Sequence, residues 1–191
     1  MSHPTLSESR EHTQVRRICL TGPECTGKTT LAHRLAAHLR AEHVPEAARL
    51  YAERVNRALR VTDVELIAAE HIVMADDAVR RVVDRGGGTL VLDTDLVSTI
   101  VYARSYYGFC SPWLDDEERR RRADLYLLCD IDVPWISDGI RDRPGDRAAM
   151  FALFVETLRE RQAQVIIVRG DWEMRWQTAL TASSQLRGTD G

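Results

Sequence analysis

The stretch Gly22-Pro23-Glu24-Cys25-Thr26-Gly27-Lys28-Thr29 fits the pattern G-x-x-x-x-G-K-[ST] of a phosphate-binding loop. The glycines of such a loop let backbone N–H groups curl around the phosphates of a nucleotide, and its last hydroxyl can bind Mg²⁺. Lys28 is the only lysine in the chain. A compact ammonium reaches between two phosphates, where a broad guanidinium is a poor substitute. We assign phosphate binding to the loop and the residue after it, namely Gly22, Pro23, Glu24, Cys25, Thr26, Gly27, Lys28, Thr29 and Thr30. The stretch therefore predicts binding of a nucleoside triphosphate.

The residues on either side of the loop have the secondary structure that this motif requires. Residues 17–21 (Arg-Ile-Cys-Leu-Thr) read as a short buried strand that enters the loop. Residues 29–39 read as an amphipathic helix that leaves it, with Leu31, Leu35 and Leu39 on one face. The positive end of that helix would point at the phosphates. This context argues against a chance match to the motif.

Apolar runs and helical patterns alternate along the rest of the chain. Buried strands are expected at 44–45, 89–93, 125–130 and 164–168, and helices at about 64–85 and 146–162. A capping box formed by Thr62 and Glu65 is expected to open the first of these helices. Near-continuous apolar strands separated by helices indicate a parallel sheet that is covered on both faces. We predict an α/β fold of the P-loop type, a three-layer sandwich around a parallel five-stranded sheet, with a lid segment.

The composition limits the class of protein. The chain has 191 residues, of which 44% are hydrophobic and 29% are charged, as in one globular domain. We expect a flexible leader over residues 1–14, a folded domain over residues 15–182 and a flexible tail over residues 183–191. A net charge of −3 gives no footprint for nucleic acid, and no apolar run is long enough for a membrane span. No signal peptide and no metal-type pairing of the four cysteines is visible, which predicts a cytoplasmic protein with free thiols.

Polar residues follow two of the predicted strands, at the edge of the sheet where doubly wound folds bind their ligands. Asp93 and Asp95 come at the end of the strand at 89–93. A carboxylate there can help to hold Mg²⁺ or accept a proton from a substrate hydroxyl. We assign these roles to Asp93 and expect Asp95 to cap the next helix. Glu46 and Arg49 follow the strand at 44–45, where they either bind substrate or form an ordinary surface ion pair.

The segment 130–147 combines two glycines, two prolines and three arginines directly after a strand. Such a segment does not pack as core. Its arginines suit a lid over about residues 133–147 that supplies positive charge to a transferring phosphate, and a solvated charged loop is the alternative. We assign Arg141 and Arg147 to catalysis and Arg143 to ATP binding.

Two other polar features are expected to be structural. The run Arg119-Arg120-Arg121-Arg122 follows four acidic residues, which indicates a solvated helix face rather than a nucleic-acid patch. His71 lies near the apolar stripe of its helix, which indicates a partly buried, hydrogen-bonded histidine.

With these segments placed, the chain resembles the ribosylnicotinamide kinase family, best known as the kinase domain of NadR-type regulators of NAD metabolism. The resemblance covers about residues 17–180. It is carried by the phosphate loop and by residues 92–95 (Leu-Asp-Thr-Asp), 106–108 (Tyr-Tyr-Gly), 132–142 (Asp-Val-Pro-Trp-Ile-Ser-Asp-Gly-Ile-Arg-Asp) and 170–175 (Gly-Asp-Trp-Glu-Met-Arg). The resemblance implies a kinase that uses ATP and Mg²⁺ to phosphorylate the 5′-hydroxyl of nicotinamide riboside, giving nicotinamide mononucleotide in NAD salvage.

The expected ligands divide among these motifs. Thr29 and Asp93 would hold Mg²⁺, partly through water, and ATP would also contact Trp172. The acceptor would bind to Glu46, Arg49, Asp93, Trp135 and Asp138. The aromatic face of Trp135 suits the cationic pyridinium ring of nicotinamide riboside. We expect a small-molecule substrate and no nucleic-acid or membrane partner, and we leave a homo-oligomer open.

The chain departs from the family pattern at two positions. The family commonly has Glu-Tyr-Ala-Arg where this chain has Glu46-Ala47-Ala48-Arg49, and it commonly has glutamine near the position of His71. Both departures bear on the identity of the acceptor. A kinase of another small alcohol or nucleoside and a non-enzymatic ATP-binding switch are therefore the alternatives. We expect a lone kinase, without the adenylyltransferase half of the bifunctional members and without a helix-turn-helix.

Overall fold

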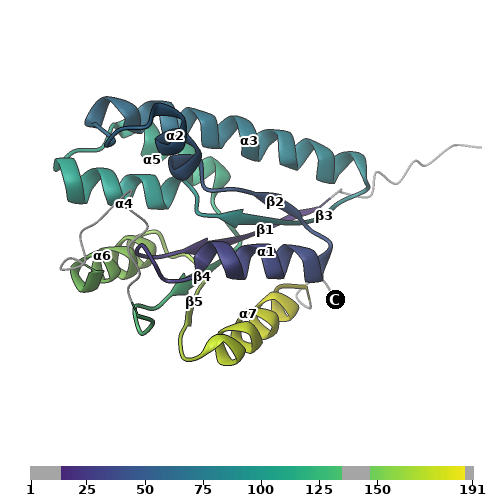
Figure 1. Ribbon diagram of the computed structural model, residues 1–191. Helices are drawn as coiled ribbons and strands as arrows, with labels where there is room; N and C mark the ends of the chain where they lie inside the picture. Colours follow the sequence, from purple (N-terminus) through teal and green to yellow (C-terminus); the bar gives the residue numbers. More distant parts are fainter. Residues whose placement is uncertain (1–13, 135–146, 188–191) are drawn as a thin grey trace, which may run out of the picture.

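Five parallel strands form one sheet at the centre of the molecule (Figure 1). The computed structural model describes residues 14–134 and 147–187. The strands are β1 (Val15–Thr21), β2 (Glu42–Val44), β3 (Gly88–Asp93), β4 (Leu125–Cys129) and β5 (Val165–Val168). Their order across the sheet is β2-β3-β1-β4-β5, and each neighbouring pair is parallel. The predicted α/β fold with a parallel five-stranded sheet is confirmed.

Helices cover both faces of this sheet and make it the middle layer of three (Figure 1). They are α1 (Lys28–Leu39), α2 (Ala47–Val55), α3 (Val64–Asp84), α4 (Leu96–Tyr107), α5 (Pro112–Arg121), α6 (Arg147–Glu160) and α7 (Trp172–Arg187). Helices α1 and α7 pack on one face, and α3, α4 and α6 pack on the other. Helix α5 packs against α3 and α4, and α2 packs against α3.

The alternation of side chains along β1 explains how both layers are held. Ile18 and Leu20 point into the core under α1 and α7, whereas Cys19 between them points to the opposite core. All three are at most 1% exposed. A strand that is buried on both faces needs apolar residues at consecutive positions, which is why the run 17–21 has no polar alternation.

The start of α3 differs from the prediction. Residues Val61–Asp63 form a 3-10 turn, so Thr62 lies inside that turn and does not cap the helix. Asp63 occupies the N-cap position of α3 but makes no side-chain capping hydrogen bond there; its carboxylate instead accepts a 2.8 Å hydrogen bond from the backbone N–H of Arg60, at the start of the 3-10 turn. The expected capping box of Thr62 and Glu65 is therefore wrong, because the chain tightens by one turn before the helix begins.

The end of α7 also differs from the expected boundary. The helix continues to Arg187, so residues 183–187 of the expected tail are helical. Ser183 is 1% exposed, and its hydroxyl donates a 2.7 Å hydrogen bond to the carbonyl of Ala179. The last helix therefore contributes core contacts beyond residue 182. None of the helices in the described ranges is both long and apolar enough to cross a membrane.

Candidate active site

The phosphate-binding loop lies between β1 and α1, as the motif predicts. Gly22 needs to be glycine, because its φ is +126° and a Cβ there would lie 2.7 Å from the carbonyl oxygen of Cys129. The side chain of Lys28 is folded back over the loop, where Nζ donates a 2.7 Å hydrogen bond to the carbonyl of Pro23. The hydroxyl of Thr26 donates to the same carbonyl at 2.8 Å. The lysine is thus held across the loop, at the N-terminus of the helix.

Asp93 lies beside this loop at the carboxyl end of β3. It is 1% exposed and pairs in register with Leu20 of β1. The Thr29 hydroxyl donates to its carboxylate, and its Oδ1 is buried without a hydrogen-bond partner among the described residues. Burial raises the pKa of Asp93, and the hydrogen bond from Thr29 opposes that rise. The structure therefore brings together the two residues assigned to Mg²⁺, with one carboxylate oxygen unused.

The next residue, Thr94, has a strained backbone. Its φ of +71° lies in the left-handed region, which a β-branched residue rarely adopts. Its backbone N–H donates a 3.0 Å hydrogen bond to the carbonyl of Leu20, which holds this conformation. Because of this turn, the carboxylates on either side of Thr94 point to different elements: Asp93 faces the phosphate loop, and Asp95 caps α4. Strain of this kind is typical of functional sites.

Asp95 is a structural cap, as predicted. Its side chain accepts a 3.0 Å hydrogen bond from the backbone N–H of Val97 and a 2.6 Å hydrogen bond from the hydroxyl of Tyr126. The side chain is 5% exposed, and burial raises the pKa of Asp95 from 3.8 to about 6. This carboxylate thus fixes the start of α4, the helix that forms one wall of the adjacent pocket.

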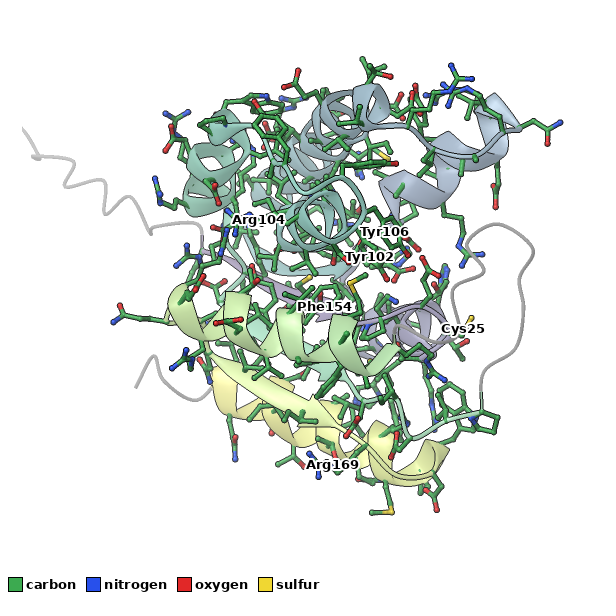
Figure 2. All side chains as sticks on the ribbon, turned by 90° about the vertical axis from the view of Figure 1, so that its left-hand side faces the viewer. Cys25, Tyr102, Arg104, Tyr106, Phe154 and Arg169 are labelled. Atoms are coloured by element: carbon green, nitrogen blue, oxygen red, sulfur yellow. The ribbon has the colours of Figure 1, made fainter. Side chains whose placement is uncertain are left out.

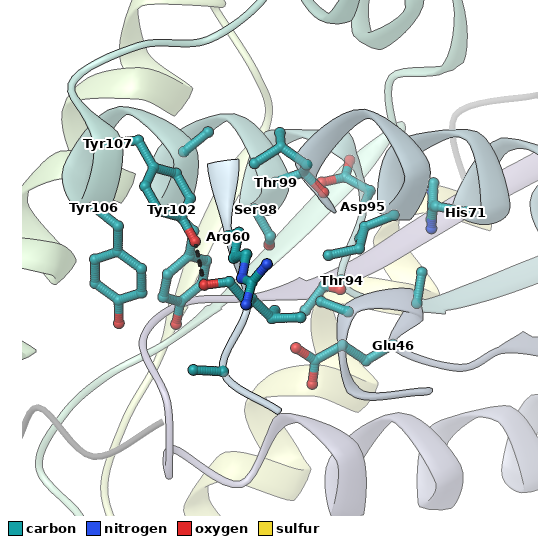
Figure 3. A pocket seen from close by; sticks show the side chains of 17 residues that line it. Glu46, Arg60, His71, Thr94, Asp95, Ser98, Thr99, Tyr102, Tyr106 and Tyr107 are labelled. Carbon is teal, nitrogen blue, oxygen red and sulfur yellow. Dashed lines mark hydrogen bonds between the residues drawn. The ribbon is translucent and has the colours of Figure 1, made fainter. Parts of the chain in front are cut away.

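A pocket of about 290 Å³ opens beside these residues, between α2, α3 and α4 (Figure 3). Its wall on α4 carries Tyr102, Tyr106 and Tyr107, and Glu46 faces it from the start of α2. The full lining is Glu46, Ala47, Ala48, Ala58, Leu59, Arg60, Val64, Ile67, His71, Thr94, Asp95, Ser98, Thr99, Tyr102, Ala103, Tyr106 and Tyr107. The pocket therefore presents aromatic rings and carboxylates next to the end of β3.

The tyrosines of α4 form a packed aromatic row. The ring centroids of Tyr102 and Tyr106 are 5.5 Å apart, and Tyr102 stands edge-on to Phe154 of α6 at 5.9 Å (Figure 2). The hydroxyl of Tyr107 donates a 3.0 Å hydrogen bond to the carbonyl of Leu59 across the pocket (Figure 3). This bond ties α4 to the loop before α3. The motif Tyr106-Tyr107-Gly108 marked two of these tyrosines without assigning them a role, and nothing in the sequence singled out Tyr102.

The loop that carries Leu59 and Arg60 is fixed from its other side. Asp63 is 2% exposed and pairs with the guanidinium of Arg57 at 2.6 Å. The hydroxyl of Tyr51 also donates to Asp63, at 3.1 Å. These hydrogen bonds and the ion pair hold the pKa of Asp63 well below its usual value, chiefly through Arg57. The rim of the pocket is therefore anchored at an ion pair whose carboxylate is buried and whose guanidinium is partly exposed.

Three ionisable residues that the sequence singled out, Glu46, His71 and Asp95, line this pocket. Glu46 is 8% exposed, and its Oε2 lies 3.7 Å from Nε of Arg49, so the two residues form an ion pair, while their binding of substrate stays a prediction. His71 is 4% exposed, and burial lowers its pKa to about 4, so it is neutral at pH 7. The histidine is thus more deeply buried than expected. Arg60 lines the rim and was not singled out from the sequence.

Of the site residues expected in the lid, Arg147 lies within the described ranges, and Trp135, Asp138, Arg141 and Arg143 lie outside them. Arg147 is the first residue of α6, and its Nη1 donates a 3.2 Å hydrogen bond to the carbonyl of Val133. Its Nε and Nη2 are buried and have no hydrogen-bond partner among the described residues. Buried N–H donors of a guanidinium that have no protein acceptor are well suited to bind an anion.

The start of α7 backs the phosphate loop. The ring of Trp172 lies against Gly27, where a Cβ would come within 2.4 Å of it. Trp172 is 50% exposed, so the ring also offers a face to solvent beside the loop. Arg175, one turn later, contacts the carbonyl of Thr26 at 3.1 Å. The structure places Trp172 against the phosphate loop, and its contact with ATP stays a prediction; Arg175 also reaches the loop, a role that the sequence did not reveal.

The arginine run on α5 is structural, as expected, although only part of it is solvated. Arg119 and Arg120 are exposed and pair with Asp116 and Glu117 of the same helix. Arg121 and Arg122 are half-buried and pair with Asp76 of α3 and with Glu118. The four cysteines are free thiols, which agrees with the prediction.

Comparisons with known proteins agree with this geometry. Residues 17–175 match the AAA domain family. The NAD biosynthesis and regulator proteins NadR of Salmonella typhimurium and Escherichia coli, both described as trifunctional, are 28% and 27% identical over 184 and 183 residues. These matches cover 93% and 91% of this chain but only 44% and 43% of the relatives. The chain thus spans less than half the length of the relatives it matches.

Solved structures give the same result. A NadR protein in complex with NR has a TM-score of 0.72 at 26% identity, covering 92% of this chain and 52% of that chain. A NadR protein in complex with NAD and AMP-PNP has a TM-score of 0.73 at 27% identity, and the match covers 93% of this chain and 51% of that chain. Thymidylate kinase from Ehrlichia chaffeensis, at 14% identity and a TM-score of 0.63, shares the fold alone. This chain belongs to the AAA domain family and is a homologue of NadR with a P-loop kinase-like fold.

Proposed function

We propose that the protein phosphorylates the 5′-hydroxyl of nicotinamide riboside with ATP and Mg²⁺, giving nicotinamide mononucleotide. The observation that carries this proposal is the position of Asp93: its carboxylate accepts from Thr29 of the phosphate loop, its buried Oδ1 has no partner among the described residues, and the next residue, Thr94, lines the tyrosine-lined pocket. A kinase needs a carboxylate where the γ-phosphate meets the acceptor hydroxyl. The likeness to a NadR protein in complex with NR supports this choice of acceptor.

The residues beside the loop fit a magnesium ion. Thr29 and Asp93 offer a hydroxyl and a carboxylate, the oxygen ligands that Mg²⁺ prefers, and Asp93 has one buried oxygen without a partner among the described residues. When bound, Mg²⁺ supplies positive charge to the β- and γ-phosphates. Thr29 and Asp93 would hold it, partly through water molecules.

Proton transfer from the acceptor falls to Asp93. Burial raises its pKa, so the carboxylate accepts a proton more readily than an exposed aspartate does. The acceptor enters from the pocket, which reaches Thr94 and Asp95 directly after it in the chain. Its 5′-hydroxyl then lies between Asp93 and the γ-phosphate, the geometry that an in-line transfer needs.

The charge of the transferring phosphate is met by Lys28 and Arg147. Lys28 exchanges its hydrogen bond to Pro23 for the β- and γ-phosphates of ATP. Arg147 contributes the donors Nε and Nη2, which have no partner among the described residues. Arg141 and Arg143 stay predictions for the same role, and Trp172 stays a prediction for ATP.

The acceptor pocket suits a cation. Tyr102 and Tyr106 offer aromatic faces to the pyridinium ring, and Glu46 adds a carboxylate. Because His71 is neutral at pH 7, Arg60 at the rim is the one fixed positive charge in the described lining. Trp135 and Asp138 stay predictions for the ring, and Glu46 and Arg49 for the ribose hydroxyls.

The test is release of ADP from ATP and Mg²⁺ with nicotinamide riboside, with uridine or cytidine, and with no acceptor, and the product is identified by mass spectrometry. Lys28→Ala is the inactive control. ADP release stimulated mainly by nicotinamide riboside supports the proposal. Faster turnover of a neutral nucleoside would indicate a kinase of another alcohol, and no stimulation by any acceptor would indicate an ATP-binding switch.

A further inference from the structure

Arg175 is a buried cation that the proposed chemistry does not use. It lies in the first turn of α7 and is 1% exposed, the largest fully buried side chain among the described residues. A guanidinium is removed from water only where its N–H groups find partners. Its surroundings therefore indicate what it holds.

The partners of Arg175 come from three separate segments. Its Nε donates to the carbonyl of Gly170 at 2.9 Å, its Nη1 to that of Thr26 at 3.1 Å, and its Nη2 to that of Asp130 at 3.1 Å. Its Nη2 also pairs with Asp132, whose other oxygen accepts a 2.5 Å hydrogen bond from the N–H of Gly170. One side chain thus joins the phosphate loop, the end of β4 and the loop before α7.

The bond to Thr26 has a consequence for nucleotide binding. In a trans peptide the C=O of one residue and the N–H of the next point in opposite directions, and no described peptide is cis. Because Arg175 holds the Thr26 carbonyl on the side of α7, the N–H of Gly27 points away from α7. The ring of Trp172 lies against the same peptide at Gly27. The first turn of α7 therefore holds one peptide of the loop by a hydrogen bond and by packing.

We propose that Arg175 is a positioning residue for the nucleotide: it orients the Thr26–Gly27 peptide so that the Gly27 N–H faces the β-phosphate. Asp132 supports it by fixing the guanidinium. The inference concerns nucleotide binding and does not depend on which acceptor is phosphorylated. Backbone N–H groups of a phosphate loop act only when they are oriented before the nucleotide arrives, since reorientation would weaken binding.

The test compares the binding of ADP and AMP by isothermal titration with Mg²⁺ present and no acceptor. In Arg175→Lys, one ammonium cannot hold three carbonyls, so the affinity for ADP should fall about tenfold or more. The affinity for AMP, which lacks the β-phosphate, should change by less than about threefold. Arg169→Ala is the matched control. Arg169 lies next to Gly170 in the loop before α7 and near the carboxylate of Asp130, but its side chain is 62% exposed. The affinities for ADP and for AMP should both stay unchanged in this variant.

The ratio of the two affinities separates positioning from a general structural role. If a variant that folds, as judged by circular dichroism, kept the wild-type ratio of ADP affinity to AMP affinity, the proposal would be overturned. Should Arg175→Lys not fold, Asp132→Asn decides by the same ratio, because it keeps the three carbonyl bonds of Arg175 and removes its ionic partner, while the remaining amide oxygen can still accept from the N–H of Gly170. Suppose that the ratio of ADP affinity to AMP affinity is lowered in the variant and that the wild type does not phosphorylate nicotinamide riboside. That pair of results would support this inference and contradict the proposed function.

Discussion

The hydroxyl of Tyr126 on β4 donates a 2.6 Å hydrogen bond to the carboxylate of Asp95 at the start of α4. The two residues are far apart in the sequence, and both are buried. The bond joins the core of the sheet to the helix that carries the tyrosines of the pocket. A carboxylate buried at this junction makes the stability of the fold sensitive to pH.

The first prediction concerns that pH dependence. Burial raises the pKa of Asp95 from 3.8 to about 6 in the folded protein, so the folded state binds a proton that the unfolded state has lost. The contribution of Asp95 to stability should therefore fall by about 3 kcal/mol as the pH rises from about 4 to about 6. Urea denaturation of the wild type and of Asp95→Asn at several pH values measures it. A stability difference that stays constant over this range would contradict the prediction.

Tyr126→Phe tests the partner of the same bond. The substitution leaves an oxygen of a buried carboxylate without its donor, and we expect a loss of about 1–3 kcal/mol in the free energy of unfolding. Since the lost hydrogen bond had favoured the ionised form, the loss should be larger at pH 7 than at pH 4. An effect that is equal at both pH values would mean that packing, not the carboxylate, dominates.

The sheet and the phosphate loop could be predicted because their signals are local. The run 89–93 shows its burial on both faces by its own composition, and the loop is defined by eight consecutive residues. Asp93 was found for the same reason, since the end of a buried strand is visible in the sequence. The capping of α4 by Asp95 followed from its position before a helix.

The pocket and the support of the loop were not visible in the same way. Tyr102 and Tyr106 are four residues apart on one helix, a spacing that fits a core face equally well. Arg175 and Thr26 are separated by 149 positions, and only the assembled fold brings them together. The positive φ of Thr94 is a backbone property that no residue type in the sequence indicates.

The strain at Thr94 gives the next prediction. Left-handed backbone costs a residue with a side chain about 1–2 kcal/mol, which glycine does not incur. Thr94→Gly should therefore keep or slightly raise the free energy of unfolding, because relief of strain offsets the greater freedom of the unfolded chain. Turnover should fall, since Asp93 loses a fixed neighbour. Thr94→Ala, which keeps the strain and removes the hydroxyl, is the control, and full turnover in Thr94→Gly would show that the strain has no catalytic role.

Asp93→Asn keeps the shape of the side chain and removes its charge. We expect turnover to fall by about 10² or more, because the acceptor hydroxyl loses its proton acceptor, while ATP still binds. Single-turnover kinetics and nucleotide titration measure the two effects. Normal turnover in Asp93→Asn together with a loss in Asp95→Asn would exchange the roles of the two carboxylates.

Arg147 should act mainly in the transition state. Its unpaired Nε and Nη2 have no other use among the described residues, so Arg147→Ala should lower kcat by about 10³ with a small change in the KM of the acceptor. Arg159→Ala on the same helix is the control, since Arg159 is an exposed residue of the last turn of α6. A loss confined to the KM of the acceptor would remove Arg147 from the phosphate site.

The aromatic pocket gives the last prediction. A cation over an aromatic ring gains about 0.5–2 kcal/mol, so Tyr106→Leu should raise the KM for nicotinamide riboside by roughly 2- to 30-fold. Tyr106→Phe keeps the aromatic face and should leave this KM near that of the wild type, and we expect Trp135→Ala to raise it as Tyr106→Leu does. The KM for uridine, which carries no charge, should respond equally weakly to all three substitutions. If the leucine variant lost both acceptors to the same extent, Tyr106 would be a wall of the pocket only, and recognition of the pyridinium charge would have to come from the carboxylates, Glu46 first among them.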